Sequence, residues 1–385
     1  MPSLASPSKN QGKEFGTKAS TFLDSQKIAK RKALEKKAHK KRIKLDDLLI
    51  FTQQLASMLE AGLPLVTCLE ALQEQVTEPV FQVIIREVKL DVSAGTAFSE
   101  ACAKFPNAFN KLFVAMTSAG EASGNLSGIL MQTASYFEES VKLTKKIKGA
   151  MVYPTVVILF AILLVNVILI FVIPVLAQMF EDFDTELPGP TLALIALSKF
   201  LKKYIFLVLI GAFVIWKIIS RFIKTPKGRV VKDTILTRMP IFGDLIKKIA
   251  ITRFTRTFAI LLKSGVPILE CLDIVASASN NTFIEKACSN VAKNVAQGGQ
   301  ISEVIAADPF FFGMIKHMIL AGEQTGNVDG MLIKVSDYYD VEIQNQVAAL
   351  TSLIEPILIV VLGVIIGGMV MAIFLPIFKM STIIN

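Results

Sequence analysis

The chain is poor in the side chains that most enzymes use for catalysis and metal binding. Its 385 residues include two histidines, four cysteines and one tryptophan. The cysteines (Cys68, Cys102, Cys271 and Cys288) show no C-x-x-C spacing, so we interpret them as small buried core residues rather than disulfide partners or metal ligands. No G-x-x-x-x-G-K-[ST], H-E-x-x-H or G-x-S-x-G motif occurs. The sequence therefore predicts no catalytic residues, no cofactor and no metal site.

Charge is also scarce: 19% of the residues are charged and 52% are apolar, which predicts membrane-spanning segments. The net charge of +9 arises from one end of the chain. Residues 1–45 contain 13 Lys or Arg and 3 Asp or Glu, so the remainder is close to neutral. Because the basic character is confined to this tail, we expect no nucleic-acid partner for the protein as a whole.

The tail itself divides into two parts. Residues 1–26 show no periodicity and lack the apolar core of a signal peptide, so we expect a disordered segment and no cleaved leader. Lys27–Lys44 carries ten basic residues and one acidic residue, Glu35. Three interpretations stay open for it: a solvated helix or arm, a contact with anionic cytoplasmic lipid, and a contact with a partner or nucleic acid.

The most informative feature is an internal repeat. The segment Phe51–Leu72, FTQQLASMLEAGLPLVTCLEAL, returns as Phe254–Val275, FTRTFAILLKSGVPILECLDIV. In each copy a glycine and a proline interrupt an apolar pattern of helical period. Glycine can take the left-handed conformation that ends a helix, and proline suits the first turn of the next one, so each copy is predicted to be a helical hairpin. The predicted turn residues are Gly62, Pro64, Gly265 and Pro267.

The rest of the first repeat is also predicted to be helical. Helices are expected from Pro79 to Gly95, over Ala97–Lys104 and over Ala108–Ala119. A loop, AGEASGN at residues 119–125, should follow, and it returns as AGEQTGN at residues 321–327. Two interpretations stay open for these loops: a turn whose glutamate lies near the positive end of the next helix, or a contact surface for a cytoplasmic partner. The candidate contact residues are Gly120, Glu121, Gly124, Asn125, Gly322, Glu323, Gly326 and Asn327.

Three segments are predicted to cross a membrane. Gly149–Phe180 has 32 residues without a charge, Tyr204–Ile223 is a second apolar run, and Pro356–Phe378 has 23 uncharged residues. Asn166 and Pro174 are costly in lipid, so we expect their face of the first span to pack against another helix.

The order of these segments predicts the topology. Each repeat is a helical domain followed by a span, so the unpaired second span is needed to return the chain to the first side. Four positive charges in 142–148 and nine in 217–248 flank the domains, whereas the 181–203 connection has three behind four acidic residues. The positive-inside rule therefore places both domains and the N-terminus in the cytoplasm and the C-terminus outside.

The predicted fold class is all-α: a polytopic membrane protein with two duplicated cytoplasmic helical bundles and three transmembrane helices. The predicted domains are a tail (1–45), bundle 1 (46–150), span 1 (151–179), a periplasmic connection (180–203), span 2 (204–223), a basic cytoplasmic linker (224–248), bundle 2 (249–351), span 3 (352–379) and a periplasmic tail (380–385).

Several of these motifs together resemble one known family. They are the duplicated G-x-P hairpin, the A-G-E-x-x-G-N loop, the P-x-x-G run Pro240–Gly243 and the ending IEPILIV…LPIF within Ile354–Phe378. Over about residues 46–380 the chain resembles the polytopic inner-membrane platform protein of type II secretion and type IV pilus systems. The resemblance implies six-helix bundles, homo-oligomers in the bacterial inner membrane and a non-enzymatic role.

It also implies partners: a cytoplasmic hexameric secretion ATPase, pilin or pseudopilin subunits, other inner-membrane assembly proteins and membrane lipid. Two other hypotheses are kept. A small-solute transporter with duplicated halves would need more polar residues within its spans than Asn166 alone. An unrecognised membrane enzyme would need Glu121 or Glu323 for its turnover.

Overall fold

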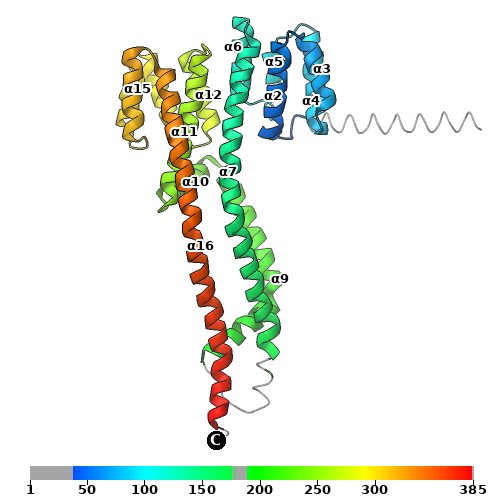
Figure 1. The fold of residues 1–385 in the computed structure, drawn as a ribbon, viewed down its shortest axis with the longest axis vertical. Coiled ribbons are helices and arrows are strands. Elements are labelled where there is room, and N and C mark those ends of the chain that lie inside the picture. Colours follow the sequence, from blue (N-terminus) through cyan, green and yellow to red (C-terminus); the bar gives the residue numbers. More distant parts are fainter. Residues whose placement is uncertain (1–37, 176–177, 179–188, 384–385) are drawn as a thin grey trace, which may run out of the picture. The chain divides into compact units, whose positions relative to one another are not determined.

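The computed structural model describes residues 38–175, 178 and 189–383, and this part of the chain is helical without β-strands. The 37 N-terminal residues and 179–188, which hold most of the predicted tail and much of the predicted periplasmic connection, lie outside the described residues. Figure 1 shows the helices. They are α2 (Leu45–Glu60), α3 (Leu65–Gln75), α4 (Pro79–Ser93), α5 (Phe98–Ala103), α6 (Lys111–Ser123), α7 (Leu126–Val167), a π-helical turn η1 (Ile168–Val172), α9 (Gly189–Ile223), α10 (Pro226–Arg238), α11 (Phe242–Lys263), α12 (Ile268–Ser279), α13 (Thr282–Ala296), α14 (Ile301–Ala307), α15 (Gly313–Thr325) and α16 (Val328–Ile383).

The two repeats form two similar sets of six helices, α2–α7 and α11–α16, as the resemblance implies. Phenylalanine rings fill the core of the first set: the centroids of Phe51 and Phe81 are 5.4 Å apart, and Phe109 lies 5.0 Å from Phe113. In the second set Phe254 occupies the position of Phe51 and its ring is packed between two other phenylalanines. Burial of these large apolar side chains is what stabilises such short helices.

The hairpin turns are confirmed. Gly62 and Gly265 have φ values of +83° and +80°, the left-handed conformation that only glycine adopts without strain. Pro64 and Pro267 lie at the N-cap positions of α3 and α12, one residue before the first helical turn in which they were expected.

The loop predicted at 119–125 is wrong for most of its length. Helix α6 continues to Ser123, and α15 likewise continues to Thr325, so Gly120 and Gly322 lie inside helices. The prediction failed because glycine usually ends a helix, whereas here the absence of a side chain serves close packing, described below.

Residues 224–248, predicted as a linker, contain the regular helix α10 and the start of α11. The Thr225 side chain accepts a hydrogen bond from the Gly228 amide and caps α10. The Asp233 carboxylate accepts a hydrogen bond from the Thr282 amide at 2.9 Å, at the first residue of α13. This segment therefore contributes a helix cap to the second repeat.

The chain divides into two compact units. Most of the helical sets belongs to the first unit, and the long apolar helices belong to the second. Unit 1 contains the described residues up to Val141, Arg253–Asn280 and Glu285–Ile333, and unit 2 contains Lys142–Thr252, Asn281–Ile284 and the described residues from Lys334 onward.

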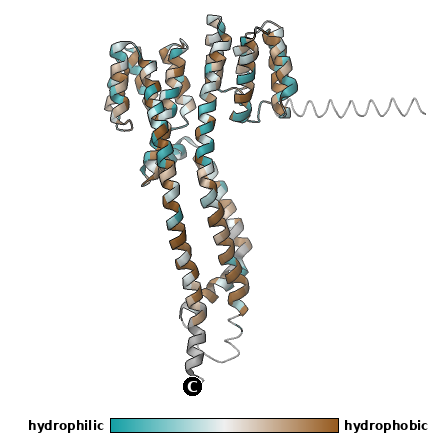
Figure 2. Ribbon diagram, in the orientation of Figure 1, coloured by the Kyte–Doolittle hydropathy of each residue, from teal (hydrophilic) through white to brown (hydrophobic). Residues whose placement is uncertain are grey.

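Two helices of the described part are long and apolar enough to cross a membrane: the helical stretches Leu126–Val175 and Val328–Ala372. Along α7 and α16 the colour changes from largely hydrophilic to hydrophobic (Figure 2). The predicted second span lies within α9, where Phe206 is 79% and Ile210 is 63% exposed. Three membrane spans stay a prediction. The length and apolar composition of the helices directly support the first and the third of them.

The first apolar stretch packs against α9, but not at the face of Asn166 that was expected to be covered, because Asn166 lies in an open apolar groove beside the exposed side chains of Leu163 and Val167. Leu169 and Ile173 are buried together with Ile195 of α9. The Asn166 amide instead donates to the Ile162 carbonyl at 2.7 Å, within its own helix. A polar side chain satisfied by its own backbone is less costly in lipid than a free one.

Candidate functional site

The repeated A-G-E-x-x-G-N motif is the candidate site, and its glutamate caps a neighbouring helix. The Glu121 carboxylate accepts hydrogen bonds from the backbone amides of Phe98 (2.6 Å) and Ser99 (3.1 Å). The Ser99 hydroxyl donates to the same carboxylate. These amides are the first donors of α5, which have no partner within the helix, and the carboxylate also lies at the positive end of the helix dipole.

The second repeat has the same arrangement. The Glu323 carboxylate accepts from the amides of Ile301 (2.6 Å) and Ser302 (3.1 Å) at the start of α14. The agreement of both distances between repeats shows that the glutamate is part of how each bundle is built. The expectation that it lies near the next helix was wrong, because the capped helix precedes it in the chain.

The glycine before each glutamate allows α6 and α15 to approach the following helix closely. A Cβ atom added at Gly120 would lie 3.1 Å from the Leu126 Cα, and one at Gly322 would lie 2.8 Å from the Val328 Cα. Both distances are shorter than ordinary van der Waals contact, so a larger residue would push the helices apart.

The last two residues of the motif form the turn. Gly124 and Gly326 end their helices with φ values of +68° and +69°. Asn125 and Asn327 then cap the next helices, each side-chain oxygen accepting from the amide three residues later at 3.2 Å. All four residues of each motif thus have a structural role, and Gly124, Asn125, Gly326 and Asn327 are also exposed.

One signal for the glutamate cap was present in the sequence. Each capped helix begins with an apolar residue followed by Ser-Glu, at 98–100 and at 301–303. The pairing of these serines with glutamates more than twenty residues later has no local period, so helical spacing could not reveal it.

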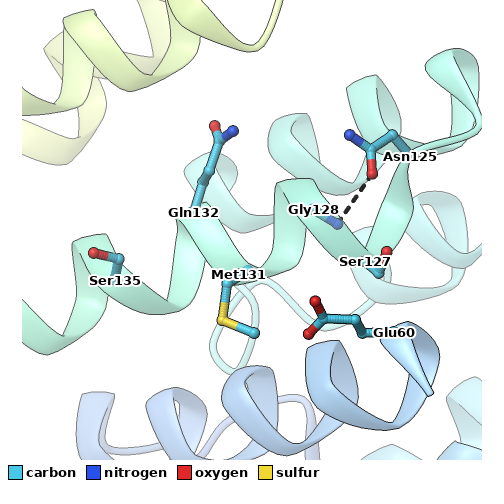
Figure 3. Close-up of a pocket in the computed structure, with 7 residues that line it drawn as sticks. All are labelled: Glu60, Asn125, Ser127, Gly128, Met131, Gln132 and Ser135. Carbon is cyan, nitrogen blue, oxygen red and sulfur yellow. Dashed lines mark hydrogen bonds between the residues drawn. The ribbon is translucent and has the colours of Figure 1, made fainter.

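An open depression of about 430 Å³ lies beside the first motif (Figure 3). Glu60, at the end of α2, faces the start of α7 across it. The lining residues are Glu60, Asn125, Ser127, Gly128, Met131, Gln132 and Ser135. It is open, and it combines hydroxyl, amide and carboxylate side chains with the apolar side chain of Met131.

Within unit 1 the two helical sets contact each other, which the sequence did not reveal. Helix α6 lies against α12. Thr257 is only 2% exposed beneath this contact. The polar contacts are Tyr136 Oη to Thr257 Oγ1 (2.8 Å), Ser264 Oγ to Gln132 Oε1 (3.5 Å) and Lys111 Nζ to Asp273 Oδ2 (2.9 Å).

The cysteines are buried and unpaired with one another, as predicted. Burial raises the pKa of Cys271 and of Cys288 to about 12 and also raises that of Cys68 and Cys102. Such thiols are poor nucleophiles and poor metal ligands at neutral pH. Among the described residues, no cluster of His, Cys, Asp or Glu has the arrangement of a metal site.

Two of the basic residues near the predicted spans, Lys146 of α7 and Lys248 of α11, make polar contacts with α16. Lys248 pairs with Asp244 (2.9 Å) and Glu342 (3.0 Å), and Lys146 donates to Gln344 at 2.7 Å. Burial lowers the pKa of Lys248, but the hydrogen bonds and charges of the two carboxylates outweigh it and the pKa is raised. This lysine therefore stays charged.

Comparison with known proteins agrees with this repeated architecture. The family model described as "Type II secretion system (T2SS), protein F" matches twice, over residues 51–174 and 254–376. The chain is 40% identical to type IV pilus assembly protein PilC of Myxococcus xanthus, over 87% of this chain and 80% of the relative. It is 41% identical to PilC of Thermus thermophilus, over 87% and 82%, and 30% identical to type II secretion system protein F of Vibrio cholerae, over 94% and 89%.

Proposed function

Because the chain belongs to the protein F family of type II secretion and type IV pilus assembly, a family of structural platform proteins, we propose that it couples a cytoplasmic hexameric ATPase to the assembly of pilin or pseudopilin subunits. In this role it is a non-enzymatic, multi-pass platform of the bacterial inner membrane.

One observation carries the proposal: the last helix of each repeat continues without a break into a long apolar segment. Helix α7 has 42 residues and α16 has 56. At about 1.5 Å per residue these exceed the ~30 Å hydrocarbon core of a bilayer, so each can belong to a bundle and still cross the membrane. A change at a bundle would then act directly on a membrane helix.

The proposed topology has three spans, with α9 as the second. Its exposed apolar side chains, such as Phe206 and Ile210, suit lipid or another apolar helix. Both bundles and the N-terminus then face the cytoplasm, on the side of the basic segments, and the C-terminus faces the periplasm.

The proposed partners follow from the two kinds of surface. The polar bundle surfaces, including the exposed turns at Gly124–Asn125 and Gly326–Asn327, are proposed to contact the ATPase. The exposed apolar stretches are proposed to meet lipid, pilin or pseudopilin helices and other inner-membrane assembly proteins.

A binding and turnover measurement tests the coupling. The full-length chain in lipid nanodiscs should bind the ATPase of the same system and raise its rate of ATP hydrolysis. A matched pair of variants at exposed, equivalent positions, Ser123→Arg and Thr325→Arg, should show which motif is in contact, because only the contacted one should lose binding. Absence of both binding and stimulation with the wild-type chain would refute the coupling role, and saturable solute uptake by reconstituted vesicles would favour a transporter.

Cysteine accessibility tests the topology independently. The native thiols are buried and should stay silent, so single cysteines can be introduced at the exposed positions Ser57 and Ser277, one in each bundle. A membrane-impermeant maleimide should label neither in intact spheroplasts and both after lysis. If the cysteine of one bundle were labelled in intact spheroplasts, that bundle would face the periplasm, and the proposal that α9 is a second membrane span would be refuted.

A further inference from the structure

The contact between the two helical sets of unit 1 joins different faces of the repeat. Gln132 of α7 meets Ser264, which directly follows α11, and Tyr136 of α7 meets Thr257 of α11. Helix α7 is the last helix of its repeat and α11 is the first of its own. The contact is therefore heterologous, head to tail, and a heterologous contact leaves one face of each kind unused.

The two unused faces are identified by the repeat. Lys334 and Tyr338 on α16 stand where Gln132 and Tyr136 stand on α7, counted from the shared A-G-E-x-x-G-N motif. Tyr338 is 48% exposed and Lys334 is exposed as well. We name Lys334 and Tyr338 the tyrosine face.

The opposite face lies on α2. Gln54 and the C-cap residue Ala61 stand where Thr257 and Ser264 stand in the second repeat, counted along the repeated hairpin. Thr257 is 2% exposed beneath the internal contact, whereas Gln54 is half-buried and Ala61 is exposed. We name Gln54, Glu60 and Ala61 the acceptor face.

The side chains on these two faces are complementary. Superposing the internal contact on them would bring the Tyr338 hydroxyl to the Gln54 amide, which can donate or accept a hydrogen bond. It would also bring the Lys334 ammonium beside Ala61 and hence beside Glu60, which is exposed and negatively charged. The second repeat thus carries a cation, and the first an anion, at the positions that would meet.

One polar pair is not repeated. Gly313 stands where Lys111 stands, so the Lys111–Asp273 ion pair has no equivalent at the unused faces. Both of its members are more than half exposed, and such pairs contribute little to a contact. The second repeat retains the tyrosine, as Tyr338, and a long polar side chain one helical turn before it, Lys334.

We propose that the tyrosine face of one copy of this chain binds the acceptor face of a second copy, repeating between molecules the contact that joins the two repeats within one. A second copy of the chain fits as the partner because its first bundle carries the acceptor face. The same bundle already takes part in a contact of this kind within the chain.

Site-directed crosslinking of the full-length chain in native membranes tests the contact. Two differently tagged single variants, Ala61→Cys and Lys334→Cys, are co-expressed and treated with a mild oxidant. We expect a disulfide-linked dimer that carries both tags, and none when either variant is expressed alone or with the wild-type chain. The double variant Gln132→Cys, Ser264→Cys is the matched control, because it should form the equivalent disulfide inside one chain and shift its mobility without doubling its mass.

Charge reversal adds a second measurement. With the cysteine pair placed at Gln54 and Tyr338 instead, Glu60→Lys should lower the yield of mixed dimer by about two- to fivefold, the range of one exposed ion pair, and adding Lys334→Glu should restore it.

Two outcomes would overturn the inference. One is the absence of a mixed dimer when the internal control disulfide forms; the other is a dimer through Ala61→Cys alone or Lys334→Cys alone at equal yield, which would show an isologous contact. The inference does not rest on coupling to an ATPase: a chain that crosslinks as expected but leaves the ATPase unaffected would keep this contact and lose the proposed function.

Discussion

Replacing Glu121 with alanine should loosen one short helix and leave its counterpart in the other repeat unchanged. The Glu121 carboxylate accepts from the Phe98 amide at 2.6 Å and from the Ser99 amide at 3.1 Å, and these are the first donors of α5. Helix α5 has six residues, too few to be stable without its cap and its packing.

The magnitude follows from the hydrogen bonds that the substitution removes. An ordinary N-cap contributes about 1 kcal/mol and a hydrogen bond to a charged group about 1.5–3 kcal/mol. Since one side chain makes all these bonds and they are not additive, we expect the local opening free energy of α5 to fall by about 2–3 kcal/mol. Amide exchange within Phe98–Ala103 should then be about 30- to 150-fold faster.

Hydrogen exchange with mass spectrometry on the full-length chain measures this directly. The peptide that covers α14 is an internal control, because Glu323 caps it independently. Glu323→Ala should give the mirror result. Glu100→Ala, at an exposed acidic position in the first turn of α5 itself, should change exchange by no more than about twofold.

Two results would refute the capping role of Glu121. Unchanged exchange in α5 would mean that the carboxylate contributes nothing there. Equal acceleration in α5 and α14 from a single variant would show a global loss of stability. Loss of ATPase binding with unchanged exchange would instead favour the contact-surface interpretation of the motif.

Three further expectations concern glycines and thiols. Gly62→Ala should lower the unfolding free energy by about 1–2 kcal/mol, because the backbone φ angle at this position is +83°. Gly313→Ala is the control: the space around Gly313 is open, so the unfolding free energy should change by less than about 0.5 kcal/mol. Urea unfolding followed by circular dichroism compares the two variants. Gly322→Ala should cost about 1–3 kcal/mol, and more than Gly120→Ala, because its Cβ would lie 2.8 Å rather than 3.1 Å from backbone, and a smaller fall in melting temperature than for Gly120→Ala would contradict this. The two thiols with a pKa of about 12 should be roughly 10⁻⁴ ionised at pH 8, so N-ethylmaleimide should label them only after denaturation.

The sequence was most informative where one residue type has one physical use. Left-handed glycines end helices, so Gly62, Gly95 and Gly265 located helix ends within one or two residues of the observed ones. The long uncharged runs likewise located the apolar parts of α7 and α16, because such a run has few alternatives to a long helix in an apolar environment.

It was least informative where a residue acts through a distant segment. Gly120 looked like a helix breaker because its contact with Leu126 exists only after the two helices pack. The two amides that donate to Glu121 lie 22 and 23 residues earlier in the chain. The hydrogen bond between Tyr136 and Thr257 joins residues 121 positions apart. Periodicity reports local geometry alone, so these contacts could not be derived from it.

The side chains of the A-G-E-x-x-G-N motif are used inside the bundle, and this affects how the motif can serve as a search pattern. The glycines provide close packing and a turn, the glutamate caps one helix and the asparagine caps another. None of these uses specifies a partner. We therefore expect any protein that carries the A-G-E-x-x-G-N pattern to share this bundle, whatever its function, if an apolar-Ser-Glu helix start precedes the pattern and another helix start follows it. Its biological role would have to be sought in the residues between the motif positions.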